Sequence, residues 1–467
     1  ATIGDHSNIK VSNLEIVAED HTKMIGVIGG ITISKKVGIG GASDVNEFNK
    51  KVYAHIGNSK VNVKYNLTAK VNSEDYILSI VVGLGGGSNA AVTGSVPVTT
   101  IKNDLDAHID SDEDILVGGD LVVEATQNDT LIIYAGAISG SKTAAVGLSA
   151  TNVIISGQIK AYLDVKNLKA NSVTILTNKR DTFSFGSVAG SVSGSISVTG
   201  AELTILVNTA MSSYIADDSN LSITKSLTIK ANHEIDSTSS TGQLAGASTT
   251  AIGAGVLVYK LELSVNSYVG NNVTVLNELE GPIIIVADSK NKLLFVVVGV
   301  AASGTTSVNG NAATILITNK VNAFVGNSST LQTNGNMLIY ANDQQDLNAD
   351  LGSAAVAGTA GINVSALVII LKSETKSSIG DATKIIVRGN GEGISYNGKT
   401  YTGLNVLAQS TQNIQGVAIT AAGGTAAVNP NALVMILNNK VIASIGTGAV
   451  ITCGADVSIQ ALSTISL

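Results

Sequence analysis

A four-residue pattern recurs nine times along the chain, and this repetition constrains the fold more than any other feature of the sequence. Each copy, which we call a box, has a small residue, any residue, an aliphatic residue and usually Gly or Asp, as at 443–446. The boxes begin at positions 1, 54, 107, 161, 213, 267, 323, 377 and 443, so successive copies lie 52 to 66 residues apart. A period of this length is typical of proteins built from stacked repeats.

A second marker shows which part of each repeat is constant in length. After each box, an alternating apolar segment usually reaches an alanine, as at Ala231, Ala287 and Ala341. The next box follows this marker after 35 to 38 residues, whereas the marker follows a box after 15 to 31. Because 36 is twice 18, the commonest value of the variable part, we expect roughly three coils in each repeat. About 26 coils at ~4.8 Å each would form a rod on the order of 125 Å long.

The composition favours a solenoid made of strands. Charged residues make up 13% of the 467-residue chain, roughly half the ~25% of ordinary domains. Segments such as 221–231 alternate apolar and polar residues, which places one side of a strand inside and the other in solvent. We therefore expect a single all-β domain over residues 1–467, a right-handed parallel β-helix, because parallel crossovers are overwhelmingly right-handed.

Charge, cysteine content and hydropathy argue against several classes of protein. The net charge is −7 and no basic patch is present, so nucleic acid is not expected as a partner. The single cysteine, Cys453, cannot form an internal disulfide. The longest apolar run, 293–302, has about half the ~20 residues that a membrane span needs. The chain opens on a box and shows no signal peptide, so we expect a fragment or processed piece of a larger repeat protein.

Stretches rich in Gly, Ala, Ser and Thr recur once per repeat, ahead of each box. Examples are 85–91, 244–255, 352–361 and 421–428. Small residues at both alternating positions suit either a narrow corner of the coil or a smooth lateral flank without bulky outward side chains. The second alternative predicts self-association along this flank.

One insertion interrupts the repeat between the eighth box and its marker. Residues 388–403 contain five glycines and an Asn397-Gly398 pair, which is typical of a protruding hairpin or loop. The segment also carries Arg388, Tyr396 and Tyr401. Since loops inserted in solenoids often bind partners, these three residues are the candidate binding residues; a neutral insertion is the alternative.

Acidic residues gather on one side of the segment 104–114. Five aspartates stand at alternate positions, so their side chains point to the same side of a strand and form an acidic ridge: Asp104, Asp106, Asp110, Asp112 and Asp114. Carboxylates suit Ca²⁺, but the glycine-spaced ligands of calcium-binding repeats are missing, so a solvated face is favoured over a metal site. No motif for catalysis or for phosphate binding stands at credible spacing, and no cofactor is expected.

The sequence pattern of the repeats resembles that of a known family. The extended box N-K-x-x-A-x-[IV]-G, found at 319–326 and 439–446, and the V-x-[IV]-x-A strand are similar to those of large leukotoxin-type adhesins, which look like the filamentous haemagglutinins. The resemblance covers essentially the whole chain and includes no catalytic motif. It implies a secreted or bacterial cell-surface location and a receptor on a host or bacterial surface as partner.

The sequence is compatible with three functions from different classes. The first is an adhesin or leukotoxin-type passenger, a non-catalytic rod that presents binding surfaces. The second is a self-assembling filament or surface-layer subunit that packs through its small-residue stretches. The third is a carbohydrate-active β-helix enzyme, for which a chain with no Trp and two Arg is poorly equipped.

The boxes also give two structural expectations. The last position should adopt a left-handed turn conformation, which Gly reaches without steric cost and Asp tolerates. The glycines are Gly57, Gly270, Gly326, Gly380 and Gly446, with Asp110 and Asp164 as tolerated substitutes. The aliphatic position should be buried on one side of the solenoid; this set is Ile3, Ile56, Ile109, Leu163, Ile215, Val269, Val325, Ile379 and Ile445.

Overall fold

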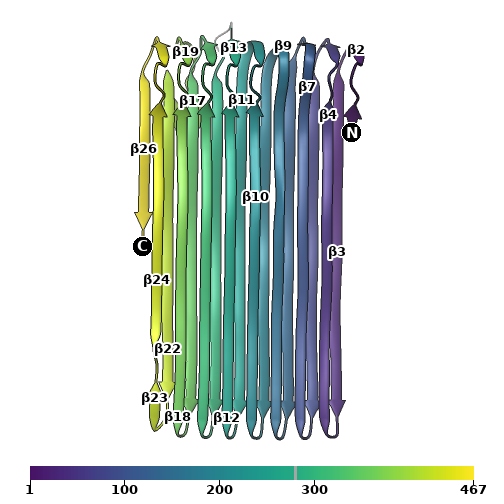
Figure 1. Ribbon diagram of the computed structural model, residues 1–467, viewed down its shortest axis with the longest axis vertical. Coiled ribbons are helices and arrows are strands. Elements are labelled where there is room, and N and C mark those ends of the chain that lie inside the picture. Colours follow the sequence, from purple (N-terminus) through teal and green to yellow (C-terminus); the bar gives the residue numbers. More distant parts are fainter. Residues whose placement is uncertain (278–280) are drawn as a thin grey trace.

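The protein is an all-β solenoid in which two layers of long parallel strands face each other (Figure 1). The computed structural model describes residues 1–277 and 281–467. Within this part of the chain, 24 strands form one continuous sheet that winds round the molecule, and two more form a small antiparallel sheet. None of the described residues belongs to a helix that could cross a membrane.

Each coil has two long sides and one short corner. The first side consists of β3 (Leu14–Ser34), β6 (Leu67–Gly87), β8 (Asp120–Ser141), the end of β9 (Ala144–Ser193), β11 (Asn220–Ala247), β14 (Ile283–Ser303), β17 (Met337–Ala357), β22 (Leu404–Gly423) and β26 (Val457–Ser466). The second side consists of β1 (Thr2–Ile3), β4 (Val37–Ile56), β7 (Ala90–Val117), the start of β9, β10 (Ile196–Ile215), β12 (Thr250–Val269), β15 (Thr306–Val325), β18 (Ala360–Ile379), β23 (Ala426–Val428) and β24 (Asn431–Ile445).

The corner joins the second side to the first side of the next coil. It contains β2 (Asn8–Val11), β5 (Lys60–Val63), β13 (Thr274–Asn277), β16 (Thr330–Thr333), β19 (Lys384–Val387) and β25 (Val450–Cys453). In three coils the corner is part of β7, β9 or β11, which run on from or into a long side. Tight turns connect the two long sides at the opposite end of the molecule (Figure 1).

One repeat makes one coil, so the expectation of three coils per repeat is wrong. Ile215 pairs with Val269, and Val269 pairs with Val325, each one whole repeat further along the chain. The constant 36-residue segment is most of one long strand, a turn and a second long strand, rather than two short coils. The markers accordingly lie inside long strands rather than at strand ends; Ala231, for example, is followed by 16 more residues of β11.

Because each coil is larger than expected, the overall shape differs from the one that the sequence predicted. Nine stacked levels at ~4.8 Å give a stack of about 40 Å, and strands of 20 residues are about 65 Å long. The longest dimension therefore runs along the strands and not along the stack, as Figure 1 shows. The protein is a flat slab instead of the long thin rod that the sequence suggested.

The aliphatic position of the box is buried, as expected. Seven of the nine residues, from Ile56 to Ile379, are at most 1% exposed, and the two in the outermost levels, Ile3 and Ile445, are half-buried against the same core. Ile109, Ile215 and Val325 belong to this apolar cluster beside the corner. A second apolar cluster fills the middle of the coil.

The last position of the box does not adopt the left-handed conformation. Positive φ values occur two residues later, for example at Asp218 (61°), Asn272 (55°) and Ser328 (56°), where the corner turns. The box glycines are needed for a different reason, which is the close approach of successive coils. A Cβ on Gly326 would lie 2.5 Å from the carbonyl carbon of Gly270 in the previous coil.

A ladder of Asn and Asp side chains explains this close approach. The Oδ1 atom of Asp217 accepts a hydrogen bond from the backbone N–H of Asn271 at 2.7 Å. In the same way, Oδ1 of Asn271 accepts a hydrogen bond of 2.9 Å from the backbone N–H of Asn327, and Oδ1 of Asn327 accepts one of 2.8 Å from that of Asp381. At Asp110 and Asp164, where the box ends in Asp, the strand continues without this turn, so no glycine is required there.

The small-residue stretches lie at the turn end, where the two sides of the coil approach most closely. A Cβ on Gly147 would lie 2.5 Å from the carbonyl oxygen of Gly190 on the facing strand. Short polar side chains bridge the two sides, such as Ser191 to Ser197 at 2.5 Å. The expected absence of bulky outward side chains is wrong, because Leu244 is 53% exposed within one of these stretches.

Substitution of a box glycine tests the close approach of the coils. We expect Gly326→Ala to lower the free energy of unfolding by about 1–3 kcal/mol, since the added methyl group must displace the backbone of the neighbouring coil. Gly310→Ala is the matched control, because the nearest atom to its added Cβ is 3.9 Å away. Urea denaturation followed by circular dichroism measures both; equal stability of the two variants would contradict the explanation.

Candidate binding cleft

The insertion at 388–403 folds back onto the slab and forms one wall of a cleft. Its centre is a hairpin of β20 (Ile394–Tyr396) and β21 (Lys399–Tyr401), joined by Asn397 and Gly398 with φ values of 46° and 72°. The hairpin turn is therefore as expected, because Asn and Gly tolerate positive φ. The hairpin does not protrude, however: Ile394 is buried in an apolar cluster with Val286, Leu338 and Leu407 on the outer surface of the first side.

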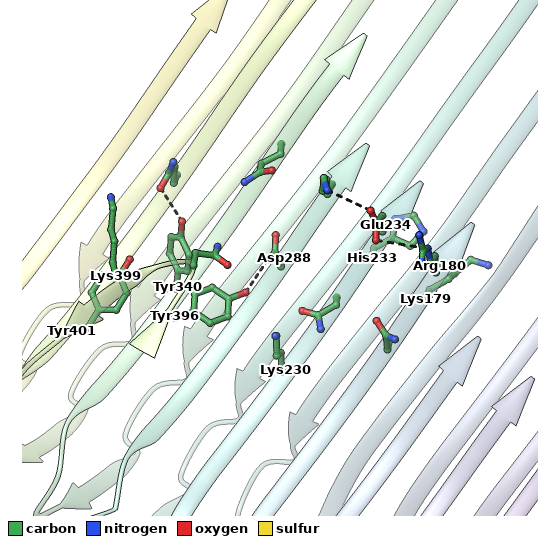
Figure 2. A pocket seen from close by; sticks show the side chains of 16 residues that line it. Lys179, Arg180, Lys230, His233, Glu234, Asp288, Tyr340, Tyr396, Lys399 and Tyr401 are labelled. Atoms are coloured by element: carbon green, nitrogen blue, oxygen red, sulfur yellow. Dashed lines mark hydrogen bonds and ion pairs between the residues drawn. The ribbon is translucent and has the colours of Figure 1, made fainter. Parts of the chain in front are cut away.

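Tyrosine side chains tie the hairpin to strands of earlier coils. The Tyr396 hydroxyl donates a hydrogen bond of 2.8 Å to Oδ2 of Asp288 on β14, which lies 108 residues earlier. The Tyr340 ring on β17 packs edge-on against the Tyr396 ring at a centroid distance of 5.6 Å. Lys230 on β11 places its Nζ 5.0 Å from the centre of the same ring. Figure 2 shows these side chains converging from separate strands.

The cleft has a volume of about 630 Å³ and a mostly polar lining. Its lining includes Tyr401 and Lys399 of the hairpin and Gln344 and Gln409 of the slab. On the far side Glu234 pairs with Lys290 at 3.4 Å, whereas the described residues offer Lys230 and Lys399 no ion-pair partner. Because Asp288 is the one carboxylate beside Tyr396 in the described part of the chain, the hairpin side of the cleft has a net positive charge.

Burial changes the ionisation of the side chains in this cleft. It lowers the pKa of Lys230, and the nearby Asp288 carboxylate opposes this change only in part. Burial raises the pKa of Tyr396 and Tyr340, and the negative charge of Asp288 raises both further. These tyrosines therefore remain neutral hydrogen-bonding groups, and the cleft has no activated nucleophile among them.

The structure separates the candidate binding residues that the sequence grouped. Tyr396 and Tyr401 line the cleft, but Arg388 is exposed at the start of the insertion and does not line it. Asp288, Lys230 and Tyr340 were not found from the sequence. They are distant from the insertion along the chain, and only the one-coil register places them beside it.

The acidic ridge lies on the outer surface of the second side and around the corner. Asp104 and Asp106 are half-buried, and Asp106 accepts a 2.8 Å hydrogen bond from Nδ1 of His108. Asp110, Asp112 and Asp114 are exposed, and Asp112 pairs with Lys166 at 3.1 Å. Across residues 1–277 and 281–467, no three His, Cys, Asp or Glu side chains are grouped so that they could hold a metal ion.

A buried charge network lies beneath one edge of the cleft, inside the slab. Lys179, only 2% exposed, places its Nζ 2.6 Å from Asp129 and 2.7 Å from Asp181. Nε2 of His233 lies 3.1 Å from the other oxygen of Asp181. Gln127 donates to both oxygens of Asp129, so the network spans three successive coils between the two apolar clusters.

Two carboxylates share one ammonium group in this network, and their pKa values move apart. Burial raises the pKa of Asp129 from 3.8 to about 7; Lys179 opposes the rise, and the charges of Asp181 and Asp75 add to it. Burial also favours the neutral form of Asp181, but Lys179 and His233 outweigh it and lower the pKa of that carboxyl.

Comparison of the chain with protein-family models, curated proteins and solved structures gives no match in any of the three. The geometry and chemistry of the cleft are therefore the basis for inferring a function.

The raised pKa of Asp129 predicts a pH-dependent stability. Between about pH 4 and pH 7 the folded protein holds a proton on Asp129 that the unfolded chain has lost, so raising the pH favours unfolding. We expect the free energy of unfolding of the native protein to fall across this interval relative to that of Asp129→Asn, which cannot titrate there. Urea denaturation at a series of pH values measures the difference.

The matched control for this pH series is Asp350→Asn, which changes an exposed aspartate on the first side. The difference in the free energy of unfolding between this variant and the native protein should stay nearly constant over the same pH interval. A stability difference for Asp129→Asn that is independent of pH would contradict the assignment of a raised pKa.

Proposed function

We propose that the protein is a non-catalytic, adhesin-type scaffold that presents the hairpin cleft to a ligand on a cell surface. The observation that carries this proposal is the insertion at 388–403, which departs from the repeat and builds a wall of a cleft rather than extending a coil. The resemblance of the repeats to secreted adhesins adds support. A secreted or cell-surface location belongs to the same proposal.

The chemistry of the cleft favours a polar, anionic ligand, for which an acidic glycan is the surface molecule that fits. Lys230 and Lys399 supply positive charge, and Gln344 and Gln409 supply donors and acceptors that suit hydroxyl groups. The half-buried ring of Tyr401 lines the cleft and offers an apolar face to a sugar ring. Tyrosine is enriched at binding sites because it combines apolar area with a hydroxyl group.

A glycan-binding assay tests the proposal. We expect the protein to bind sulfated or sialylated glycans on an array in preference to neutral ones, and Tyr401→Ala to weaken that binding about tenfold, as truncation of a central aromatic contact does. Tyr65→Ala is the control, because Tyr65 is 49% exposed at a corner remote from the insertion in sequence. Equal loss of binding in both variants, or no preference for acidic glycans, would contradict the proposal.

A second candidate, lateral self-association, is favoured by a row of outward aliphatic side chains on the second side. The row is in register through eight levels, and every member is a valine or isoleucine: Ile39, Val92, Val146, Val198, Ile252, Val308, Ile362 and Val428. The end members Ile39 and Val428 are 70% and 54% exposed, and the inner members are half-buried to exposed, with Ile252 at 39% and Ile362 at 37%. Continuous exposed apolar strips of this kind mark interaction surfaces, and a second copy presents a strip of the same length and spacing.

Charge substitution in this row distinguishes self-association from a monomeric scaffold. We expect Ile252→Lys combined with Val308→Lys to shift the sedimentation coefficient towards that of the monomer, because burying lysines between two copies is unfavourable. Thr314→Lys, on an outward position of β15 outside the row, should leave the assembly intact. A native protein that sediments as a monomer at all concentrations would exclude this second candidate.

A further inference from the structure

A ladder of stacked aromatic rings runs along the outer surface of the second side, at the second position of the boxes. Its members occupy one row of the register: His55, His108, Tyr162, Tyr214, Tyr268 and Phe324. Consecutive ring centroids are 4.6 to 4.8 Å apart, and the ring planes are within 11° of parallel. Each inner ring therefore has both faces covered by its neighbours.

The ladder stops at Phe324, although the row continues. The next two positions in register are Ser378 on β18 and Ser444 on β24, whose side chains cannot cover an aromatic face. Phe324 is stacked on Tyr268 at 4.7 Å, and no ring lies in register on its other side. A cleft of about 620 Å³ occupies this place and is lined by Phe324, Ser378 and Ser444.

The size of the gap matches an aromatic ring. Two coils span about 9.6 Å along the stack, whereas a ring in van der Waals contact needs about 3.5–4 Å above the face on which it stacks. A planar ring, single or fused, therefore fits above Ser378 and Ser444 and continues the ladder. Offset stacking of this kind contributes about 0.5–1.5 kcal/mol beyond the area that it buries.

The charges around the gap favour an anion. Lys320 and Lys376 line it, and the described residues contain no ion-pair partner for either ammonium group. Of the two acidic residues of the lining, Glu374 is neutralised by Lys440 at 3.1 Å, whereas Asp381 keeps its charge and accepts a 2.7 Å hydrogen bond from the backbone N–H of Thr447. With Lys440 included, three positive and two negative side chains surround the gap, which leaves a net positive charge. The two lysines are therefore the groups left to bind a ligand charge.

We propose that this gap is a binding site for a planar aromatic acid, whose ring stacks on Phe324 and whose anionic group pairs with Lys376 and Lys320. The site is separate from the hairpin cleft, which lies on the other long side of the coil, and it does not depend on the function proposed for that cleft.

The absence of tryptophan from the chain makes this site directly measurable. Indole-3-acetate serves as the probe, because its indole fluorescence can be excited beyond the tyrosine absorption band without a signal from the protein. We expect its fluorescence anisotropy to rise on titration with the protein. Indole-3-acetamide, which has the same ring without the charge, should bind about fivefold more weakly. No rise with indole-3-acetate at millimolar protein would overturn the proposal.

Filling the gap should remove the site. In Ser378→Phe combined with Ser444→Phe, the new side chains continue the ladder and occupy the space of the ligand, so we expect the anisotropy change to disappear. Ser212→Phe is the matched control, because it adds a ring at an outward position of β10 away from the gap. Unchanged binding in the filled variant, when it folds, would overturn the proposal.

A charge variant keeps the proposal testable if the filled variant fails to fold. Lys376→Gln combined with Lys320→Gln retains Phe324 and the gap; Lys320 is exposed and Lys376 is half-buried on the outer surface. We expect it to lower the affinity for indole-3-acetate about fivefold and to leave that for indole-3-acetamide unchanged. Equal loss of affinity for the two probes, or no loss for either, would show that the lysines do not bind the carboxylate and would overturn the proposal.

Discussion

Backbone hydrogen bonding between successive coils is the constraint on which the rest of this structure depends. Each residue of a long strand pairs with the residue one repeat later, so residues at equivalent positions form straight rows. The 35 to 38 residues between marker and box are constant because both long sides must stay in register through every level. The corner carries shorter strands, and the long insertion at 388–403 is accommodated there because it disturbs no long row.

The interior is not uniformly apolar, and its polar layer selects the register. The side chains of Lys179, Asp129 and Asp181 lie between two apolar clusters and are at most 2% exposed. Burying them is unfavourable unless each finds its partner. A two-residue displacement of this strand towards its start would keep the alternation of inward and outward side chains but would place the buried Lys179 opposite Ala125 and Ala231. The network therefore penalises a shift that the hydrophobic pattern alone would tolerate.

The sequence predicted the solenoid, the period and the burial of residues such as Ile215, because these follow from local alternation and simple repetition. It did not predict the coil size, since the segment between marker and box divides equally well into two short coils or into two long strands. It placed the box glycines in the wrong conformation because a close approach between coils cannot be seen along one repeat. Tyr396 and Tyr401 could be singled out by their loop, whereas Asp288 became their neighbour only through the stacking of coils.

The hydrogen bond from Tyr396 to Asp288 has a mechanical consequence. When tension is applied along the stack, the coils of a solenoid separate one after another, because the backbone hydrogen bonds between two coils break before those of the next pair. The insertion rests on strands from three earlier coils, β11, β14 and β17, so it clamps those rows together. Peeling from the carboxyl-terminal end must detach the hairpin before it can proceed past β17. The same feature that shapes the cleft therefore adds resistance to tension along the stack in this region of the slab.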